Sequence, residues 1–365
     1  MSQQSIDRLR LGMFVMPIHD PGKALARCLD EDLELAVACE RLGFDEFWVG
    51  EHHTSTLENI VMPEIFIAKA LAMTGTMRFG PAPVCLQYHH PVHVANRLAF
   101  LDHLSHGRLN VCFGPGAIPT DMEVYGVDPQ DTSSRVGEAA EMILKIWTSD
   151  PPYHLSGKFW NVNLGRHLDP EMGLGALHKP LQRPHPPIYY GATSPESPSM
   201  VARRGWNLAL SRQPLANCAR AIKAYRAERA ALGNTDGGDA IMVRDIYVAE
   251  TDEQAWTEAP PQITRFWQLA TDNVWRGESI TADDLPRFTE RFAYFPGGLT
   301  VKRLDEWGTS LIGSPETVVR KARSMIEATR PDSLVGMFSF GGLSHAQVTR
   351  SIELFGTKVM PALGD

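Results

Sequence analysis

The chain has 365 residues, of which 43% are hydrophobic and 21% are charged, and its formal net charge is -8. The negative charge, together with the lack of a Lys/Arg-rich run, argues against a nucleic-acid surface. No apolar stretch approaches the roughly 20 residues that cross a bilayer, and the polar N-terminus does not resemble a secretory signal. The composition therefore predicts a globular cytoplasmic protein, with no membrane segment, whose partner is a small molecule.

The cysteines are odd in number, scattered, and never spaced as Cys-x-x-Cys. This pattern indicates neither a disulfide framework nor a zinc site, and it fits a reducing compartment. The five residues are Cys28, Cys39, Cys85, Cys112 and Cys218.

In chain order, apolar runs bounded by Gly, Pro or polar residues predict eight strands. They lie at about 11–16, 46–50, 77–86, 109–113, 187–190, 206–211, 241–249 and 333–340. Apolar residues at helical spacing predict helices at about 30–42, 63–73, 91–104, 133–147 and 217–232, one ending at Arg204, one opening at Ser314, and one at 345–359. Strands that alternate with helices predict a parallel sheet covered by helices. Eight strands with seven or more helices favour an α/β fold of the closed (β/α)8 TIM-barrel type, as one domain over 1–365, against a doubly wound sheet.

Two segments interrupt this alternation. Residues 148–186 are rich in Gly and Pro, and the strand-like piece at 158–164 predicts a small external hairpin. Residues 251–307 contain helical pieces and the pair Gly297 and Gly298, and they are long enough to cover a barrel mouth. We expect this second insertion to act as a lid and to hold the most mobile segment near the mouth.

The apolar run that begins at Glu46 ends abruptly in Glu51, His52 and His53. In a barrel, ionisable groups at the carboxyl end of a strand face the active-site mouth. Neighbouring strand residues point to opposite faces, so both histidines face one pocket only if the strand has already ended. We therefore expect one of them to be structural, and a pair of hydrogen-bonded loop histidines is the alternative interpretation.

Metal binding by this group with His89, His90 or His93 is the less favoured hypothesis, because no His-x-x-x-His or Glu-x-x-His helix pair is present. A dinucleotide fingerprint at Gly114 and Gly116 is rejected, since Pro115 has no amide to donate and a proline occupies the position of the third glycine. A Ser-His-Asp site is weaker still, because no Gly-x-Ser-x-Gly elbow follows a strand.

Two strand exits are candidates for ligand contact. At Gly114 to Gly116 the chain either lets a flat ligand approach the backbone or simply makes a tight turn. At Thr193 to Ser197 hydroxyls and free amides converge on a predicted helix N-terminus, a geometry that binds anions. Ordinary helix capping by Ser and Thr explains this second loop equally well.

Over nearly its whole length the chain resembles the bacterial luciferase-like flavin monooxygenases. The resemblance rests on segments in a fixed order, none of which is specific alone. They are 43–45 with Trp48 and 51–53, then 90–92, 101–102, 107–109, 313–316, 351–355 and 359–361. Within this group, the chain is more similar to the limonene and diketocamphane monooxygenases. The segments that carry this similarity are 58–60 before 63–65, together with 177–182 and 184–187.

The resemblance implies a (β/α)8 barrel that binds reduced FMN at its mouth, with a separate NAD(P)H-dependent reductase supplying the flavin. It implies that His52 is the catalytic histidine and that Ala82-Pro83 is a cis peptide beneath the flavin ring. It assigns Thr193, Ser194 and Ser197 to the phosphate loop. We expect Gly114 and Gly116 to contact the cofactor as well, because their strand exit lets a flat ligand approach the backbone.

The chain departs from luciferase at two positions. Gly114 replaces a reactive cysteine, and Pro115 replaces an arginine near the phosphate, so the resemblance does not extend to aldehyde luminescence. We expect Arg212, at a later strand exit, to supply the charge that neutralises the phosphate.

The function implied is a two-component monooxygenase that uses reduced FMN and O2 to oxygenate a small apolar substrate, such as a terpene or cyclic ketone, working as a homodimer or higher homo-oligomer. Two alternatives stay open. One is a deazaflavin-dependent hydride-transfer enzyme of the same fold, and the other is a non-catalytic flavin-binding protein.

Overall fold

The computed structural model describes residues 8–16, 18–192, 194–234, 238–275, 301–340 and 342–364, and within 266–275 it describes the backbone only. All five cysteines are buried and free. Within these described ranges, no helix combines the length and the apolar character that crossing a membrane requires.

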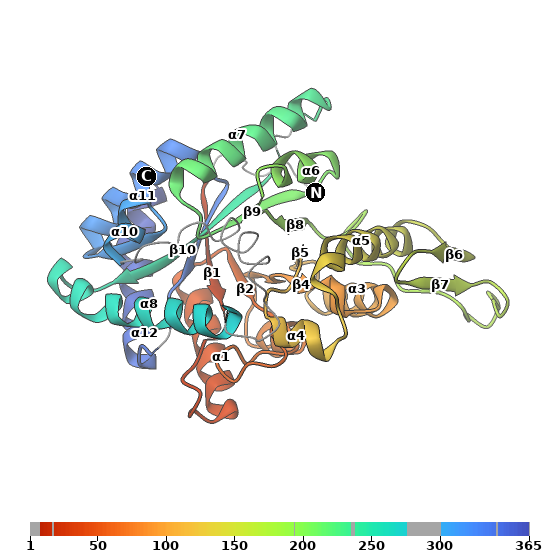
Figure 1. Ribbon diagram of the computed structural model, residues 1–365, viewed down its shortest axis with the longest axis horizontal. Helices are drawn as coiled ribbons and strands as arrows, with labels where there is room; N and C mark the ends of the chain where they lie inside the picture. Colours follow the sequence, from red (N-terminus) through yellow and green to blue (C-terminus); the bar gives the residue numbers. More distant parts are fainter. Residues whose placement is uncertain are drawn as a thin grey trace.

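Parallel strands form the centre of the molecule and helices surround them (Figure 1). The order around the sheet is β3-β2-β1-β12-β10-β9-β8-β5-β4. The strands are β1 (Arg10–Val15), β2 (Glu46–Val49), β3 (Arg78–Pro81), β4 (Val84–Cys85), β5 (Val111–Gly114), β8 (Ile188–Gly191), β9 (Asn207–Ser211), β10 (Ala240–Val248) and β12 (Ser333–Met337). The predicted TIM-barrel fold is confirmed.

The third predicted strand is bent, and this bend closes the barrel. Its first half, β3, pairs with β2, and its second half, β4, pairs with β5. Between the halves lies the cis peptide Ala82-Pro83, as predicted, while a bridge from Phe79 to Leu109 links β3 to the segment before β5. A proline has no N–H to donate to a regular ladder, so prolines are tolerated at this bend, where the ladder is interrupted.

One parallel strand was not predicted, β11 (Ser310–Gly313), which pairs with the second half of β10. β9 pairs with the first half of β10, over Ala240 to Val243, so β10 is long enough to serve both neighbours. A four-residue segment that begins with serine gives little periodicity from which to predict a strand.

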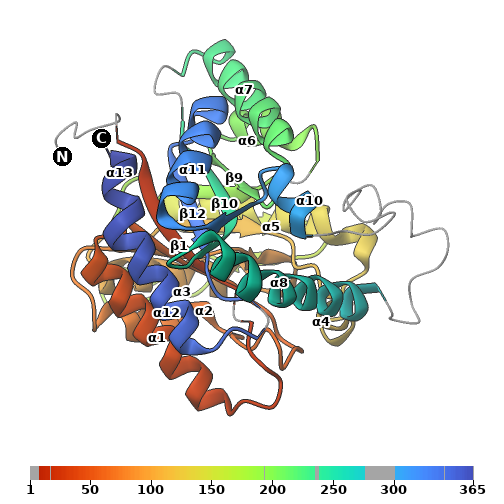
Figure 2. The ribbon, with the colours of Figure 1, turned by 90° about the vertical axis from the view of Figure 1, so that its left-hand side faces the viewer.

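The helices cover the outside of the barrel, and Figure 2 shows α1, α12 and α13 close together on one side. Gly43 ends α1 with a positive φ of 84°, and Ser314 and Ser344 cap α11 and α12 by accepting bonds from backbone amides. The helices are α1 (Leu25–Leu42), α2 (Pro63–Leu71), α3 (Pro91–Leu104), α4 (Pro119–Val124), α5 (Thr132–Thr148), α6 (Ser197–Arg203), α7 (Leu215–Ala231), α8 (Asp252–Trp275), α10 (Val301–Glu306), α11 (Pro315–Thr329), α12 (His345–Leu354) and α13 (Met360–Gly364). A π-helical turn, Phe355–Val359, joins the last two. The predicted last helix, 345–359, therefore continues five residues further with this turn inside it.

The first insertion contains the predicted hairpin, but it is longer than expected. Its strands are β6 (Tyr153–Ser156) and β7 (Asn161–Leu164), so residues 158–160 of the predicted strand lie in the turn. Three backbone amides of this turn, from Lys158 to Trp160, donate to the Glu138 carboxylate of α5. The hairpin thus lies beside α5 at one end of the molecule (Figure 1). In the second insertion, Gly297 and Gly298 lie outside the described residues.

The barrel interior is filled by side chains rather than open. Trp48 is fully buried and its ring meets that of Tyr189 edge-on at 5.1 Å. Around this pair lie buried residues of the other strands, namely Phe14, Cys112, Ala209, Ile241, Val243, Val335 and Met337. A filled interior leaves the strand ends as the place for chemistry.

Candidate functional site

The loop after β2 crosses the carboxyl end of the sheet. The amide of Ala82 donates to the carbonyl of Val49 at 2.8 Å, so the cis peptide lies beside the end of β2. Glu51, His52 and His53 follow once the strand has ended. The two histidine rings therefore need not alternate between faces, and they occupy two different environments.

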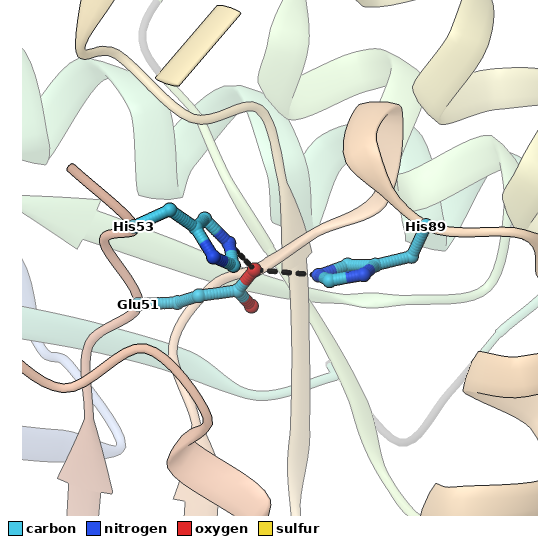
Figure 3. A group of neighbouring side chains, drawn as sticks. All are labelled: Glu51, His53 and His89. Atoms are coloured by element: carbon cyan, nitrogen blue, oxygen red, sulfur yellow. Dashed lines mark hydrogen bonds and ion pairs between the residues drawn. The ribbon is translucent and has the colours of Figure 1, made fainter. Parts of the chain in front are cut away.

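Glu51 lies between two imidazoles (Figure 3). Its Oε1 accepts from His53 Nε2 at 2.8 Å and from His89 Nε2 at 2.6 Å, and its Oε2 accepts from the amide of Cys85 at 3.2 Å. Burial alone would raise the pKa of Glu51, but the hydrogen bonds and charges of the two histidines lower it to about 2. Tyr125 completes this group, because its hydroxyl lies 3.1 Å from His53 Nδ1. The contacts of His53 are thus those expected of a structural histidine.

The geometry of this trio favours hydrogen bonds over a bound ion. Glu51, His53 and His89 place one potential ligand atom each within 4.8 Å of one another. Two ligands about 2.1 Å from an ion and at right angles are separated by about 3.0 Å, which exceeds both of the nitrogen–oxygen distances given above. Hydrogen bonds between the imidazoles and the carboxylate account for contacts this short.

His52 faces a second group of carboxylates. Its Nδ1 lies 3.5 Å from Asp121 Oδ2, and its Nε2 lies 3.7 Å from Glu58 Oε1. Burial alone would lower the pKa of His52, but Glu58 and Asp121 raise it above its ordinary value. Asp121 also accepts from the amides of His53 and Thr54 and from the Thr54 hydroxyl, so it fixes the loop that carries His52.

The backbone beside this group is closely packed. A β-carbon at Gly114 would lie 2.9 Å from Pro83, and one at Gly116 would lie 2.7 Å from the Tyr88 hydroxyl. Contacts this short exclude larger side chains unless the neighbours move. The exits of β4 and β5 are therefore tight, as predicted, and Ala82, Pro83 and Gly114 lie next to one another along the rim.

The next two strand exits along the sheet carry the predicted phosphate-binding residues. Ser194 and Ser197 lie at the start of α6 with their hydroxyl oxygens 2.9 Å apart, while Thr193 lies outside the described residues. Arg212 follows β9, where its guanidinium lies 3.6 Å from the buried carboxylate of Asp245. Gln213 joins the two loops by donating to the carbonyl of Ala192 at 2.6 Å.

Sequence analysis missed Asp121 and Glu58 as members of the site, and it considered His89 only as a ligand in the less favoured metal hypothesis. Asp121 comes from α4, a short helix that the pattern does not predict, and only the chain fold brings it to His52. Pro119, with the acidic Asp121 two residues later, is a signal for the start of a helix. It does not say which strand end that helix will face.

The described residues thus form one continuous rim of strand ends, from the two histidine groups through the glycine exits to the loops after β8 and β9. Limonene 1,2-monooxygenase of Rhodococcus erythropolis is 28% identical over 360 residues, which cover 97% of this chain and 86% of that protein. The 4-hydroxyprotoasukamycin monooxygenase of Streptomyces nodosus subsp. asukaensis is 42% identical over 147 residues, only 40% of either chain.

Among solved structures, the oxygenating constituent of 3,6-diketocamphane monooxygenase from Pseudomonas putida, in complex with FMN, superposes with a TM-score of 0.80. The identity is 23%, over 97% of this chain and 98% of that one, so this match concerns the fold. The sequence profile of the luciferase-like monooxygenases matches residues 9–332. The chain belongs to the luciferase-like monooxygenase family.

Proposed function

We propose that this protein is the oxygenase component of a two-component flavin-dependent monooxygenase. It would use reduced FMN, supplied by a separate NAD(P)H-dependent reductase, and O2 to oxygenate a small apolar substrate. The observation that carries the proposal is the placement of His52, a nearly buried imidazole between two carboxylates, at a strand end of a luciferase-like barrel. A group of this kind can move a proton near neutral pH.

The residues along the rim fit FMN. The cis peptide Ala82-Pro83 and the tight exits at Gly114 and Gly116 suit the close approach of a flat ring. The hydroxyls of Ser194 and Ser197 at the start of α6 suit a phosphate, and Thr193 is the further candidate in that loop. Arg212 adds positive charge at the next exit, although Asp245 balances part of it. When bound, reduced flavin supplies the two electrons that activate O2.

The protein's own part in the reaction is to bind, orient and exchange protons. His52 would give or take the proton at the reacting oxygen, while the Glu51 group holds the adjacent loop in place. The buried side chains of the interior form an apolar floor that keeps water away from this end of the barrel. The second insertion, 251–307, is the proposed lid. The domain organisation that we propose is one barrel over the whole chain.

The proposed substrate class is a terpene, a cyclic ketone or a molecule of similar size and polarity. Support comes from the limonene and diketocamphane monooxygenases among the relatives. Epoxidation, hydroxylation and Baeyer-Villiger insertion are all compatible with one imidazole at the rim.

An anaerobic titration with reduced FMN, followed by O2 and a panel of terpenes and cyclic ketones, tests the proposal. We expect saturable binding of reduced FMN and oxygenated product that requires O2. Binding and turnover with a reduced deazaflavin, in the absence of O2, would instead establish the hydride-transfer alternative. Flavin binding without any product from the panel would favour a flavin-binding protein.

We also propose that the protein is cytoplasmic and assembles as a homodimer or higher homo-oligomer. The free buried cysteines fit a reducing compartment. The neighbouring helices α2 and α3 expose large apolar side chains, with Ile65 69%, Phe100 63% and Leu104 50% exposed. Large apolar side chains that are exposed on neighbouring helices are typical of a subunit interface. Light scattering on a size-exclusion column would measure the mass, and a monomer at micromolar concentration would contradict this part.

A further inference from the structure

The surroundings of His52 determine its charge. Within the described part of the chain, both of its ring nitrogens face carboxylate oxygens, Nδ1 that of Asp121 at 3.5 Å and Nε2 that of Glu58 at 3.7 Å. The side chain is 14% exposed, so water screens these contacts only weakly. His52 Nδ1 makes no hydrogen bond of good geometry, which leaves the ion-pair contact with Asp121 as its main interaction.

A neutral imidazole has one N–H and one lone pair, and an ionised carboxylate can only accept. One of the two contacts would therefore set a lone pair against a negative oxygen. With both nitrogens protonated, the ring carries a positive charge and each nitrogen lies within ion-pair distance of a negative carboxylate oxygen. The geometry thus fits the imidazolium form and disfavours both neutral tautomers.

Asp121 is held in its ionised form by other donors. Its carboxylate accepts from the Thr54 amide at 2.8 Å, from the Thr54 hydroxyl at 2.6 Å, and from the His53 amide at 3.2 Å. Burial would raise the pKa of Asp121, but His52 and these donors lower it. The same bonds fix the carboxylate relative to the loop that carries His52.

We propose that Asp121 is a positioning residue that, with Glu58, holds His52 as an imidazolium, so that His52 enters the reaction as a proton donor. In that step the N–H bond of His52 breaks, an O–H bond forms on the reacting oxygen, and the neutral ring is reprotonated from solvent. The role in the reaction rests on the proposed function, whereas the charge of His52 in the resting protein does not.

Three carboxylates from two elements surround His52. Glu51 and Glu58 belong to the loop after β2, and Asp121 belongs to α4; Glu51 is already bound to His53 and His89. All three favour the charged ring. A raised pKa means that the imidazolium is complete at low pH and is lost as pH rises through that pKa. Activity that depends on a proton donor should therefore fall on the alkaline side.

Nuclear magnetic resonance of protein labelled with ¹⁵N-histidine measures the charge directly. The chain has 13 histidines, and the spectrum of His52→Gln identifies the signals of His52. We expect His52 in the wild type to stay doubly protonated above the pH range in which histidines usually titrate. Asp121→Asn should lower its pKa by roughly 1 unit or more, the usual scale for losing an adjacent opposite charge.

Thr120→Val is the matched control, because Thr120 precedes Asp121 and its hydroxyl touches that of Thr54 at 2.6 Å, but it carries no charge. We expect this variant to leave the titration of His52 unchanged. Glu58→Gln provides a second test if Asp121→Asn does not fold, and it should also lower the pKa. An ordinary pKa for His52 in the wild type, or one that neither variant lowers, would overturn the proposal.

The pH profile separates this inference from the proposed function. If both hold, the alkaline fall in kcat moves to lower pH in Asp121→Asn, with KM little changed. If the pKa of His52 drops in the variant but the wild type oxygenates no substrate, the charge assignment stands and the proposed function fails. A uniform loss of activity at every pH, with an unchanged titration, would make Asp121 a purely structural residue.

Discussion

The two ends of the barrel both bury carboxylates, and different groups lie beside Glu46 at one end and Glu51 at the other. At the end where the strands begin, Arg10 pairs with Asp239, Tyr189 donates to the same carboxylate, and Ser333 donates to Glu46. At the mouth, the imidazoles of His52, His53 and His89 lie beside the carboxylates of Glu51, Glu58 and Asp121.

This difference separates stability from chemistry. A guanidinium keeps its proton at any pH the protein meets, so the Arg10 group can only hold strands together. An imidazole exchanges its proton near neutrality, so the mouth can both hold a loop and transfer a proton. Substitutions at the two ends should therefore give different phenotypes.

The largest expected effect is at the mouth. We expect His52→Ala to lower oxygenation by roughly 10² or more, the usual scale for losing a positioned acid or base, while FMN binding stays within a few-fold. Stopped-flow single turnovers and a flavin titration would measure the two quantities. Failure to bind reduced FMN would make His52 a cofactor anchor, and unchanged product yield would shift the proton transfer to another group.

The next effect concerns acid stability. The pKa of Glu51 is lowered from 4.5 to about 2, so its contribution is complete above pH 4.5 and is lost as the pH falls towards 2. The linkage predicts a loss of about 2 to 3 kcal/mol in the free energy of unfolding over that range. Urea unfolding at several pH values would measure it. Glu51→Gln should flatten this pH dependence, and equal slopes in the two proteins would contradict the assignment.

At the opposite end, Arg10→Met should lower the free energy of unfolding by about 1 to 2 kcal/mol. This is less than the cost of breaking a fully buried pair, since Arg10 and Asp239 are partly exposed. Glu46, which is buried, would then face Asp239 without its nearby cation. Activity per folded molecule should not change, and a specific loss of oxygenation would show that the two ends are coupled.

The smallest effect is expected in the phosphate loop. Ser194→Ala and Ser197→Ala should each weaken FMN binding by a few-fold to tenfold, the scale of one hydrogen bond of about 1 kcal/mol. Ser199→Ala, later in α6, serves as the control. Variants that bind FMN as well as the wild type would place the phosphate elsewhere.

Local pattern was enough to predict the barrel, the His52 strand end and the start of α6, because each depends on residues close in sequence, while the family resemblance predicted the cis peptide. The partners of those residues were not predictable in this way. Asp121 lies 69 residues after His52 in the sequence, and Asp239 lies 229 residues after Arg10. Contacts of this range follow from the closed sheet, which places all strand beginnings at one end and all strand ends at the other.

The most direct test of this comparison is the fate of ¹⁸O2 in the wild type, His52→Ala and Arg10→Met, each loaded with reduced FMN and an accepted substrate. The label in the product and in hydrogen peroxide is measured for each. We expect equal incorporation into product for the wild type and Arg10→Met, and labelled hydrogen peroxide in place of product for His52→Ala. Equal loss of incorporation in both variants, or none in either, would contradict the assignment of chemistry to the mouth.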